Sequence, residues 1–356
     1  MNILIIKLGS IGDIVHTLPA LSGIRGANPD AKIAWVAERR SAEILRGNPM
    51  IDKLIEVDTR ALRGAKAVEE IKNVVVGQVV SLRGERFDVS LDFQGLLKSS
   101  VIGKLSGATR RWGFSRKNLR EPSSRIFLTD TVKIPEKTHI VRKNLMLAEQ
   151  ALGISVPGST FDFPLYTTGE HRREALGILK NAGERFAVLN PAGGWVTKLW
   201  HAEKFGQLAD RLWDDAGITS VVVTGPNENE LAGRVQAASG SGKLLLAEPS
   251  LKGFYELAKR ATVYVGGDTG PTHIAIAAGA PIVGLFGPTE WWRNGSLDPR
   301  DICVERTDIA CRVDCHRRTC SKWICMDSDV ETAFRAVQAR LSNAESGRFG
   351  ETALRI

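Results

Sequence analysis

The chain has 356 residues, of which 43% are hydrophobic and 25% are charged, and its formal net charge is +8. This length exceeds one ordinary hydrophobic core and suits two domains of about 150 to 180 residues each. The composition is that of an ordinary globular protein. The positive charge favours an anionic partner such as a nucleotide, a phosphorylated lipid, nucleic acid or an anionic membrane surface.

Membrane-spanning and secreted classes do not fit the sequence. No apolar stretch reaches the roughly 18 residues that cross a bilayer, and the longest candidate, 274–286, is interrupted by Gly279, Pro281 and Gly284. The apolar start is too short for a signal peptide and ends at Lys7, so it indicates a first β-strand. Four of the five cysteines crowd into residues 311–325, unlike a secreted disulfide framework. We expect a cytosolic protein.

The first half alternates between strands and helices. The almost fully apolar run 2–7 predicts a strand buried on both faces of a parallel sheet. Further strands are predicted at 32–37, 54–57 and 89–92, and helices at 14–24, 68–82 and 142–152. Residues 108–135 are less regular and basic, and 153–169 have the composition of a linker. The alternation indicates a doubly wound sheet with right-handed crossovers.

The second half repeats the alternation. Strands are predicted at 186–190, 219–224, 263–266 and 281–286, and helices at 202–216, 228–239, 251–259 and 273–278. We therefore predict an α/β protein with two Rossmann-like domains, 1–165 and 166–340, a ligand cleft between them, and a tail at 341–356.

The first candidate site is the loop from Lys7 to Asp13, which follows the first strand. Ligands of open α/β sheets bind beyond the carboxyl ends of the strands, and Gly9 and Gly12 permit a tight turn there. Asp13 is therefore a candidate for chemistry, although a helix N-terminus also favours an acidic residue. The loop is neither a dinucleotide-binding fingerprint nor a Walker A loop.

Three loops of the second half are candidates for an anionic ligand. The segment 266–273 ends a strand and begins a helix, whose N–H groups and dipole suit a diphosphate. Lys198, in a glycine-bearing loop, could reach a phosphate. Glu228 or Glu230 could bind ribose hydroxyls. A capped helix with a buried His273, a solvated lysine and ordinary acidic residues at a helix start are the structural alternatives.

Two further clusters stand out. Arginine side chains suit carboxylates and phosphates, and the first half contains many of them, including Arg60, Arg63, Arg120 and Arg142. Nucleic acid is disfavoured as their partner because the interleaved aromatic residues of a single-strand binder are missing. Four thiols, Cys311, Cys315, Cys320 and Cys325, could hold a metal ion, although their spacing is not that of paired knuckles. Reduced or disulfide-linked thiols remain alternatives.

Several blocks occur in an order that resembles glycosyltransferase family 9, the bacterial heptosyltransferases, and most of all its type I lipopolysaccharide enzymes. The resemblance runs from residue 1 to about residue 340. The blocks are KLGSIGDIVHTLPAL, SLDFQGLLKSS, LREPSSRIF, THIVRKNLMLAEQALG, PAGGWVTKLWHAEKF, GPNENE, GGDTGPTHIAIAAGAP and GLFGPT.

The resemblance implies a GT-B fold, in which two Rossmann-like domains face each other and the C-terminal one holds most of the donor. It implies inverting transfer of L-glycero-D-manno-heptose from ADP-heptose, the donor substrate, onto Kdo of the lipopolysaccharide inner core, with no cofactor and no catalytic metal. The implied partners are ADP-heptose, Kdo-lipid A and the anionic inner membrane. The enzyme would touch the cytoplasmic face of that membrane peripherally.

The resemblance also implies residue roles. Asp13 would be the general base that takes the acceptor proton. The donor-binding residues would be Lys198, Glu228, Pro249, Leu251, Asp268, Thr269, Gly270 and His273, with Glu228 at the ribose and Pro249 and Leu251 near the adenine. The acceptor-binding residues would be Arg60, Arg63, Arg120 and Arg142.

Two features depart from the type I pattern. The four-cysteine segment is more similar to heptosyltransferase II and related core transferases, and the stretch 197–200 matches the donor loop only in part. Heptosyltransferase II, or a family 9 transferase with another sugar nucleotide, is therefore an alternative. A non-catalytic protein that binds a nucleotide or an anionic lipid is an alternative of another class. An NAD-dependent oxidoreductase is disfavoured because the glycine fingerprint is absent.

Overall fold

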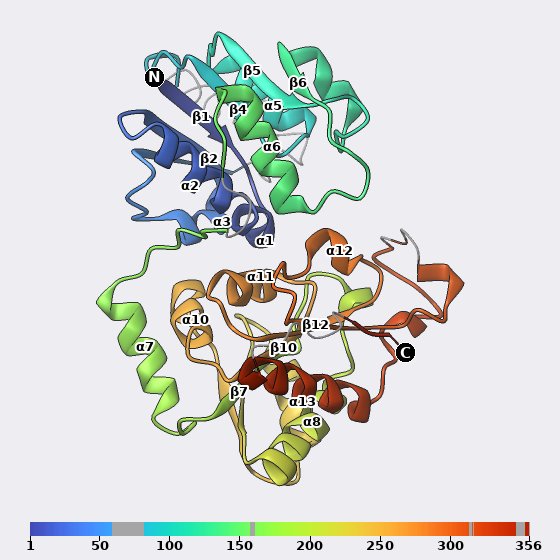
Figure 1. The fold of residues 1–356 in the computed structure, drawn as a ribbon. Coiled ribbons are helices and arrows are strands. Elements are labelled where there is room, and N and C mark those ends of the chain that lie inside the picture. Colours follow the sequence, from blue (N-terminus) through green and yellow to red (C-terminus); the bar gives the residue numbers. More distant parts are fainter. Residues whose placement is uncertain (59–81, 157–160, 313–314, 316, 347–352, 356) are drawn as a thin grey trace. The chain divides into compact units, whose positions relative to one another are not determined.

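The computed structural model describes residues 1–58, 82–156, 161–312, 315, 317–346 and 353–355. The chain divides into two compact units, Met1–Tyr166 and Thr167–Ile356, and Figure 1 shows a sheet with flanking helices in each. The division lies one residue from the boundary expected from the sequence.

A fully parallel sheet forms the centre of the first unit. Its strands follow the order β3-β2-β1-β4-β5-β6. Their bounds are β1 Asn2–Ile6, β2 Lys32–Glu38, β3 Lys53–Val57, β4 Val89–Asp92, β5 Arg110–Phe114 and β6 Asp130–Val132. All of β4 is buried, as expected when helices cover both faces of a sheet.

The strand order creates a switch point between β1 and β4. From β1 the chain proceeds outward to β2 and β3, and then returns to β4 on the other side of β1. Ile6 pairs with Asp92, so both strands end side by side. Loops that leave such neighbouring strands in opposite directions open a crevice at their carboxyl ends, where ligands of doubly wound sheets bind.

The helices of the first unit are α1 Ile11–Val15, α2 Leu18–Ala27, α3 Arg39–Ala42, α5 Leu97–Leu105 and α6 Ile140–Leu152, with 3₁₀ turns Glu43–Leu45 and Pro122–Phe127. One helix was predicted over 14–24, but the structure has two, because the chain breaks at His16 and Thr17. Pro19 then occupies the first turn of α2, where its missing N–H costs nothing. The predicted helix at 68–82 lies almost wholly outside the described residues.

The second unit has the same plan with one more strand. Its parallel sheet follows the order β13-β12-β11-β10-β7-β8-β9. The bounds are β7 Phe186–Asn190, β8 Thr219–Val223, β9 Leu244–Ala247, β10 Val263–Gly267, β11 Ile282–Phe286, β12 Ile302–Glu305 and β13 Ala353–Arg355. The switch point lies between β7 and β10, where Asn190 pairs with Gly266.

Helices cover both faces of this sheet (Figure 1). They are α7 Gly169–Leu179, α8 Ala202–Ala216, α9 Asn229–Ala237, α10 Leu251–Ala258, α11 Gly270–Ala277, α12 Trp291–Asn294 and α13 Val330–Ser346, with 3₁₀ turns Val196–Lys198, Ala310–Arg312 and Ile324–Met326. One core cluster joins β7, β10 and β11 to α8 and α13, and includes Phe205, Leu212 and Phe334. The predicted tail at 341–356 instead starts inside α13, and β13 pairs with β12.

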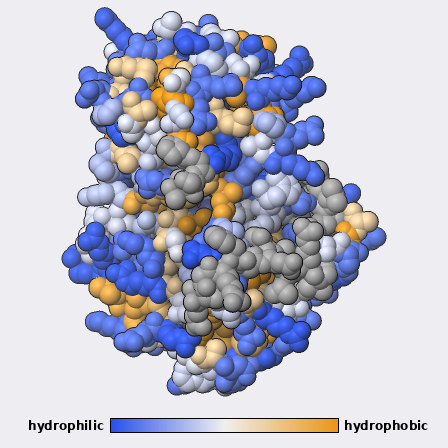
Figure 2. Space-filling model, in the orientation of Figure 1, coloured by the Kyte–Doolittle hydropathy of each residue, from blue (hydrophilic) through white to orange (hydrophobic). Residues whose placement is uncertain are grey.

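No described helix is both long enough and apolar enough to cross a membrane. On the face drawn in Figure 2, hydrophilic residues cover much of the described surface of each unit, and hydrophobic residues form small patches.

Candidate functional site

The predicted donor residues lie in four loops at the carboxyl edge of the second sheet and at the starts of the helices that follow two of them. Asp268 follows β10, Lys198 lies beyond β7, Glu228 beyond β8, and Pro249 with Leu251 beyond β9. Because β10, β7, β8 and β9 are consecutive in the sheet, the four loops follow one another along its edge. Neighbouring strands are about 4.8 Å apart, so the row extends over roughly 14 Å.

A buried ion pair lies at the switch point of this sheet. The Lys198 ammonium Nζ is 2.6 Å from Asp268 Oδ2, and the two side chains are only 14% and 4% exposed. His273 Nε2 lies 3.1 Å from the other oxygen, Oδ1, and Asn294 donates to Oδ2 over 3.3 Å. Asp268 is therefore enclosed by donors and orients Lys198.

The charge of this cluster follows from its contacts. Burial by itself raises the pKa of the Asp268 carboxyl, but the hydrogen bond and charge of His273 and the ammonium of Lys198 hold that pKa well below its usual range. The carboxyl is therefore ionised at neutral pH. The Lys198 ammonium also lies 4.4 Å from the centre of the Trp195 ring, a cation–π contact that further restricts it.

The loop after β7 and the loop after β10 pack so closely that Gly267 is required between them. A Cβ atom added at Gly267 would lie 2.8 Å from the Lys198 carbonyl oxygen, inside any tolerated contact. Thr269 comes directly before α11 in the extended conformation, so the first turn of α11 begins beside Lys198. N–H groups of a first helical turn lack intrahelical acceptors, and the helix dipole favours an anion there.

The predicted ribose and adenine residues lie farther along the same edge. Glu228 is half-buried, and its Oε2 accepts from the Gly225 N–H over 2.6 Å. Pro249 and Leu251 are half-buried on either side of Ser250, whose Oγ accepts from the Gly253 N–H and so caps α10. Glu228 also lies directly before α9, as in the alternative of an ordinary acidic residue at a helix start.

Asp13 lies at the switch point of the first sheet. One carboxylate oxygen, Oδ2, accepts from the Ser10 N–H over 2.9 Å, and the other, Oδ1, is 3.9 Å from the Lys7 ammonium, with the Asp13 side chain 29% exposed. The Gln94 side-chain oxygen accepts from the N–H groups of Leu8 and Gly9 and so fixes the loop before α1. The carboxylate is held in place but still accessible to a substrate.

The four arginines predicted to bind the acceptor differ in their surroundings. Arg60 and Arg63 lie outside the described residues. Arg120 is exposed, and its charge acts on Lys7 beside Asp13, so the fold brings it to the same edge. Arg142 instead stacks on the Phe161 ring, 4.8 Å from guanidinium carbon to ring centre.

The other basic residues between 108 and 125 divide into two groups. Arg110 of β5 pairs with Asp130 of β6, and Arg111 and Arg125 donate to backbone carbonyls, so these three side chains have partners within the first unit. Arg116 and Lys117 are exposed.

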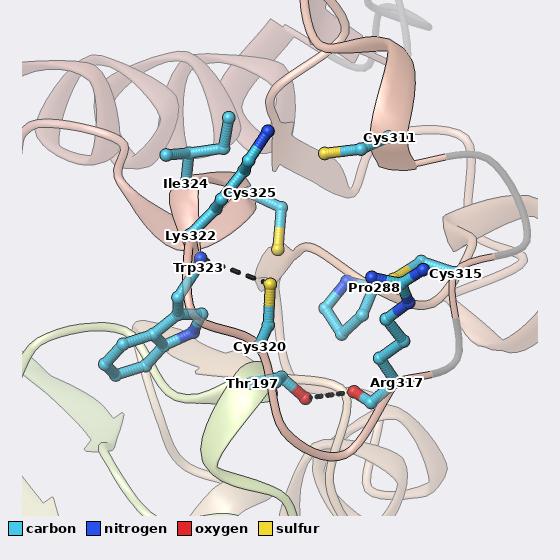
Figure 3. A pocket seen from close by; sticks show the side chains of 10 residues that line it. All are labelled: Thr197, Pro288, Cys311, Cys315, Arg317, Cys320, Lys322, Trp323, Ile324 and Cys325. Atoms are coloured by element: carbon cyan, nitrogen blue, oxygen red, sulfur yellow. Dashed lines mark hydrogen bonds between the residues drawn. The ribbon is translucent and has the colours of Figure 1, made fainter.

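The four clustered cysteines line one small cavity, shown in Figure 3. All four thiols are free, so the disulfide alternative is absent. The thiols of Cys320 and Cys325 point toward one another (Figure 3). Among the side chains that the structure describes, however, no three potential ligands are grouped so as to hold a metal ion. The four thiols line the wall of the cavity, and the predicted metal site stays a prediction.

This cavity adjoins the donor loop. Thr197 lines it and donates to the Arg317 carbonyl oxygen over 2.6 Å. Burial raises the pKa of the Cys325 thiol, with a smaller contribution from the other thiols, whereas the Trp323 and Lys322 N–H groups lower the pKa of Cys320. The cysteine segment therefore supports the turn that carries Lys198.

Comparison with known proteins supplies the family. Residues 78–324 match the family described as "Glycosyltransferase family 9 (heptosyltransferase)". The chain belongs to glycosyltransferase family 9. Lipopolysaccharide heptosyltransferase 1 of Pseudomonas aeruginosa is 30% identical over 90% of this chain and 88% of its own length. The Escherichia coli protein of the same name is 31% identical over 82% of this chain and 89% of its own length.

A solved relative agrees in fold. The structure of Escherichia coli heptosyltransferase WaaC with ADP-2-deoxy-2-fluoro heptose has a TM-score of 0.74 and 26% identity, and covers 98% of this chain and 100% of that one. The predicted α/β, GT-B fold with two Rossmann-like units is confirmed. This family 9 chain is a glycosyltransferase, as predicted from its motifs.

Sequence reasoning assigned no role to several residues that lie at the carboxyl edges of the two sheets. Lys7, Asp92 and Asn294 each contact a predicted site residue or lie beside one. Lys7 and Asp92 lie where a buried strand ends, and the sequence pattern indicates this position because ligands bind beyond the carboxyl ends of such strands. Asn294 lies 26 positions from Asp268, and no local pattern connects the two.

Proposed function

We propose that this chain transfers L-glycero-D-manno-heptose from ADP-heptose to a Kdo residue of the lipopolysaccharide inner core, with inversion at the anomeric carbon. The observation that carries the proposal is the row of loops along β10, β7, β8 and β9 in a family 9 chain. The row offers, in order, a cation with a helix N-terminus, a carboxylate and an apolar contact, which are the partners of a diphosphate, a ribose and a base.

In the proposed reaction Asp13 takes the proton of the acceptor hydroxyl, whose oxygen attacks the anomeric carbon as the bond to the diphosphate breaks. A single carboxylate suffices for one in-line displacement. Lys198 and the first N–H groups of α11, from Thr269 and Gly270, offset the charge that develops on ADP. Asp268 and His273 keep Lys198 in place through the 2.6 Å and 3.1 Å contacts.

The proposal needs no metal ion or cofactor, because the protein supplies the positive charge. We expect transfer to continue at an unchanged rate in excess chelator. Loss of activity that added Mg²⁺ restores would contradict this part of the proposal.

On the acceptor side, we propose that Arg120 contributes to binding the Kdo carboxylates and lipid A phosphates, together with Arg60, Arg63 and Arg142. The exposed Arg116 and Lys117 favour peripheral contact with the anionic cytoplasmic face of the inner membrane. Flotation with anionic and neutral vesicles tests the contact, which should be lost in the neutral ones.

A panel of donors and acceptors tests the central proposal. The expected result is transfer from ADP-heptose to Kdo2-lipid A. Turnover only with an already heptosylated acceptor would move the chain to heptosyltransferase II, and turnover only with another sugar nucleotide would change the donor. ADP binding without transfer to any acceptor would support a non-catalytic protein.

A second experiment tests the general base. We expect Asp13→Ala to lose at least about a hundredfold in kcat while its affinity for ADP stays within twofold, because base catalysis typically contributes that much. Equal transfer by the mutant and the parent protein would remove Asp13 from the mechanism.

A further inference from the structure

The buried ammonium of Lys7 has no role in the reaction as described so far. Lys7 directly follows β1, and its side chain is only 4% exposed. Long cationic side chains are almost never fully buried unless they are paired. A lysine at this depth therefore requires an explanation, and its contacts supply one.

Oxygen atoms from two segments of the chain lie around Lys7. Its Nζ donates to the Phe93 carbonyl oxygen over 2.9 Å and lies 3.9 Å from Asp13 Oδ1. The charge of Asp92, at the end of β4, acts on it favourably, and that of Arg120 unfavourably. The ammonium therefore lies at the switch point, between the exposed carboxylate of Asp13 and the buried one of Asp92.

Asp92 does not require Lys7 as a hydrogen-bond partner. Its Oδ1 accepts from the N–H groups of Gln94 and Gly95, and its Oδ2 accepts from the Ser99 hydroxyl. Asp13 has fewer partners, with the Ser10 N–H on one oxygen and Lys7 as the cation beside the other. The lysine is therefore of most consequence for Asp13.

We propose that Lys7 is a positioning residue for Asp13: its buried ammonium places a fixed positive charge beside Oδ1 and turns that oxygen inward, so that the carboxylate stays fixed at the mouth of the crevice. This inference rests on the proposed function, since it assigns to Lys7 a task in the step that Asp13 performs. A buried charge costs several kcal/mol unless it is compensated. A lysine with a purely structural role would leave the pH profile of the reaction unchanged when it is replaced.

The test uses the full chain with two substitutions. Lys7→Met keeps the length of the side chain and removes its charge, and Lys7→Arg keeps a charge. We expect Lys7→Met to lower kcat at least about tenfold and to move the acid limb of the pH profile of kcat/KM upward by about one pH unit, because loss of the neighbouring cation favours the protonated carboxyl. In Lys7→Arg the acid limb should remain near that of the parent protein.

Two further measurements separate this role from a structural one. ADP affinity of Lys7→Met should stay close to that of the parent protein, and its thermal midpoint shows whether the variant is folded at the assay temperature. An unchanged acid limb in Lys7→Met would overturn the proposal, whether or not kcat falls. If Lys7→Met does not fold, Lys7→Arg decides, since an acid limb displaced by more than half a pH unit in that variant would equally contradict the role.

Failure of this inference can be told from failure of the general-base proposal. If Asp13→Ala transfers heptose as the parent protein does, the base is wrong, whatever Lys7→Met shows. If Asp13→Ala is inactive and Lys7→Met retains the parent pH profile, only the positioning role is wrong.

Discussion

At the scale of single residues, a buried carboxyl with several hydrogen-bond partners lies at the carboxyl edge of each sheet. The contacts of His273 and Lys198 lower the pKa of Asp268 in spite of its burial. Burial dominates at Asp92, where it raises the pKa of the carboxyl to about 6 against the opposing hydrogen bonds of Gly95, Ser99 and Gln94. The pKa values of two carboxyls at equivalent switch points thus shift in opposite directions, because Asp268 contacts the Lys198 ammonium and His273 whereas Asp92 has mainly neutral donors.

The raised pKa of Asp92 predicts a pH-dependent cost to stability. The carboxyl has its ordinary value of 3.8 in the unfolded chain and about 6 in the folded one, so the folded state holds the proton more tightly. The protonated form stabilises the fold at low pH, and this contribution is lost as pH rises from about 4 to above 6. Asp92→Asn should therefore gain stability relative to the parent protein, by about 1 kcal/mol more at pH 7.5 than at pH 5.

Urea unfolding of both proteins at the two pH values measures this difference, and the comparison cancels all other titrating groups. Asparagine can preserve the contacts, because a single oxygen, Oδ1, accepts from both backbone N–H groups. A difference between the two proteins that does not change with pH would contradict the raised pKa.

At the scale of elements, the donor edge depends on how closely its loops approach. Gly267 lets the end of β10 lie against the carbonyl of Lys198, and the cysteine segment supports the same turn through Thr197 and Arg317. The positions of Lys198 and Asp268 therefore each depend on more than one loop.

We expect Gly267→Ala to weaken ADP binding at least about tenfold, because its Cβ would meet the Lys198 backbone at 2.8 Å and displace the loop. Isothermal titration with ADP measures the effect. Gly177→Ala, in α7, is the matched control, since nothing lies within 4 Å of a Cβ added there. Equal affinities in the two variants would show that the loop tolerates the extra atom.

The cysteine segment makes a separate prediction about thiol reactivity. Cys311 and Cys320 are exposed and Cys303 is buried, so a thiol reagent should modify the exposed pair first, Cys315 and Cys325 more slowly, and Cys303 only after unfolding. The reaction is followed by absorbance and mass spectrometry. A native protein with fewer than four reactive thiols, or with bound zinc or iron, would contradict the free thiols described above.

At the scale of the whole molecule, each unit repeats one strand plan, and the predicted chemistry follows its switch point. The proposed proton acceptor, Asp13, belongs to the first unit, and the proposed donor loops belong to the second. This division predicts that donor binding and base catalysis can be removed separately.

Thermal unfolding in the presence of ADP tests the division. ADP at a hundred times its Kd should stabilise the native protein by about 2.7 kcal/mol, and Asp13→Ala should retain this shift. Lys198→Met should lose most of it, because the cation beside the diphosphate is gone. A normal ADP shift in Lys198→Met would remove the lysine from the donor site.

The sequence by itself determined the fold class, the family and most strands of both sheets. Buried parallel strands are short apolar runs, and βα alternation leaves few topologies. It did not reveal β5, β6, β9, β12 or β13, or the helices α5, α7 and α13. These elements have mixed composition, and tertiary packing decides their structure.

Only the tertiary structure decided which residues meet. It paired Lys198 with Asp268 across 70 positions and placed Lys7 beside Asp92, and it left the four thiols unjoined around a cavity. The physical reason is that sheet order, which no local pattern encodes, brings the ends of distant strands to one edge, and burial there decides which charges need a partner.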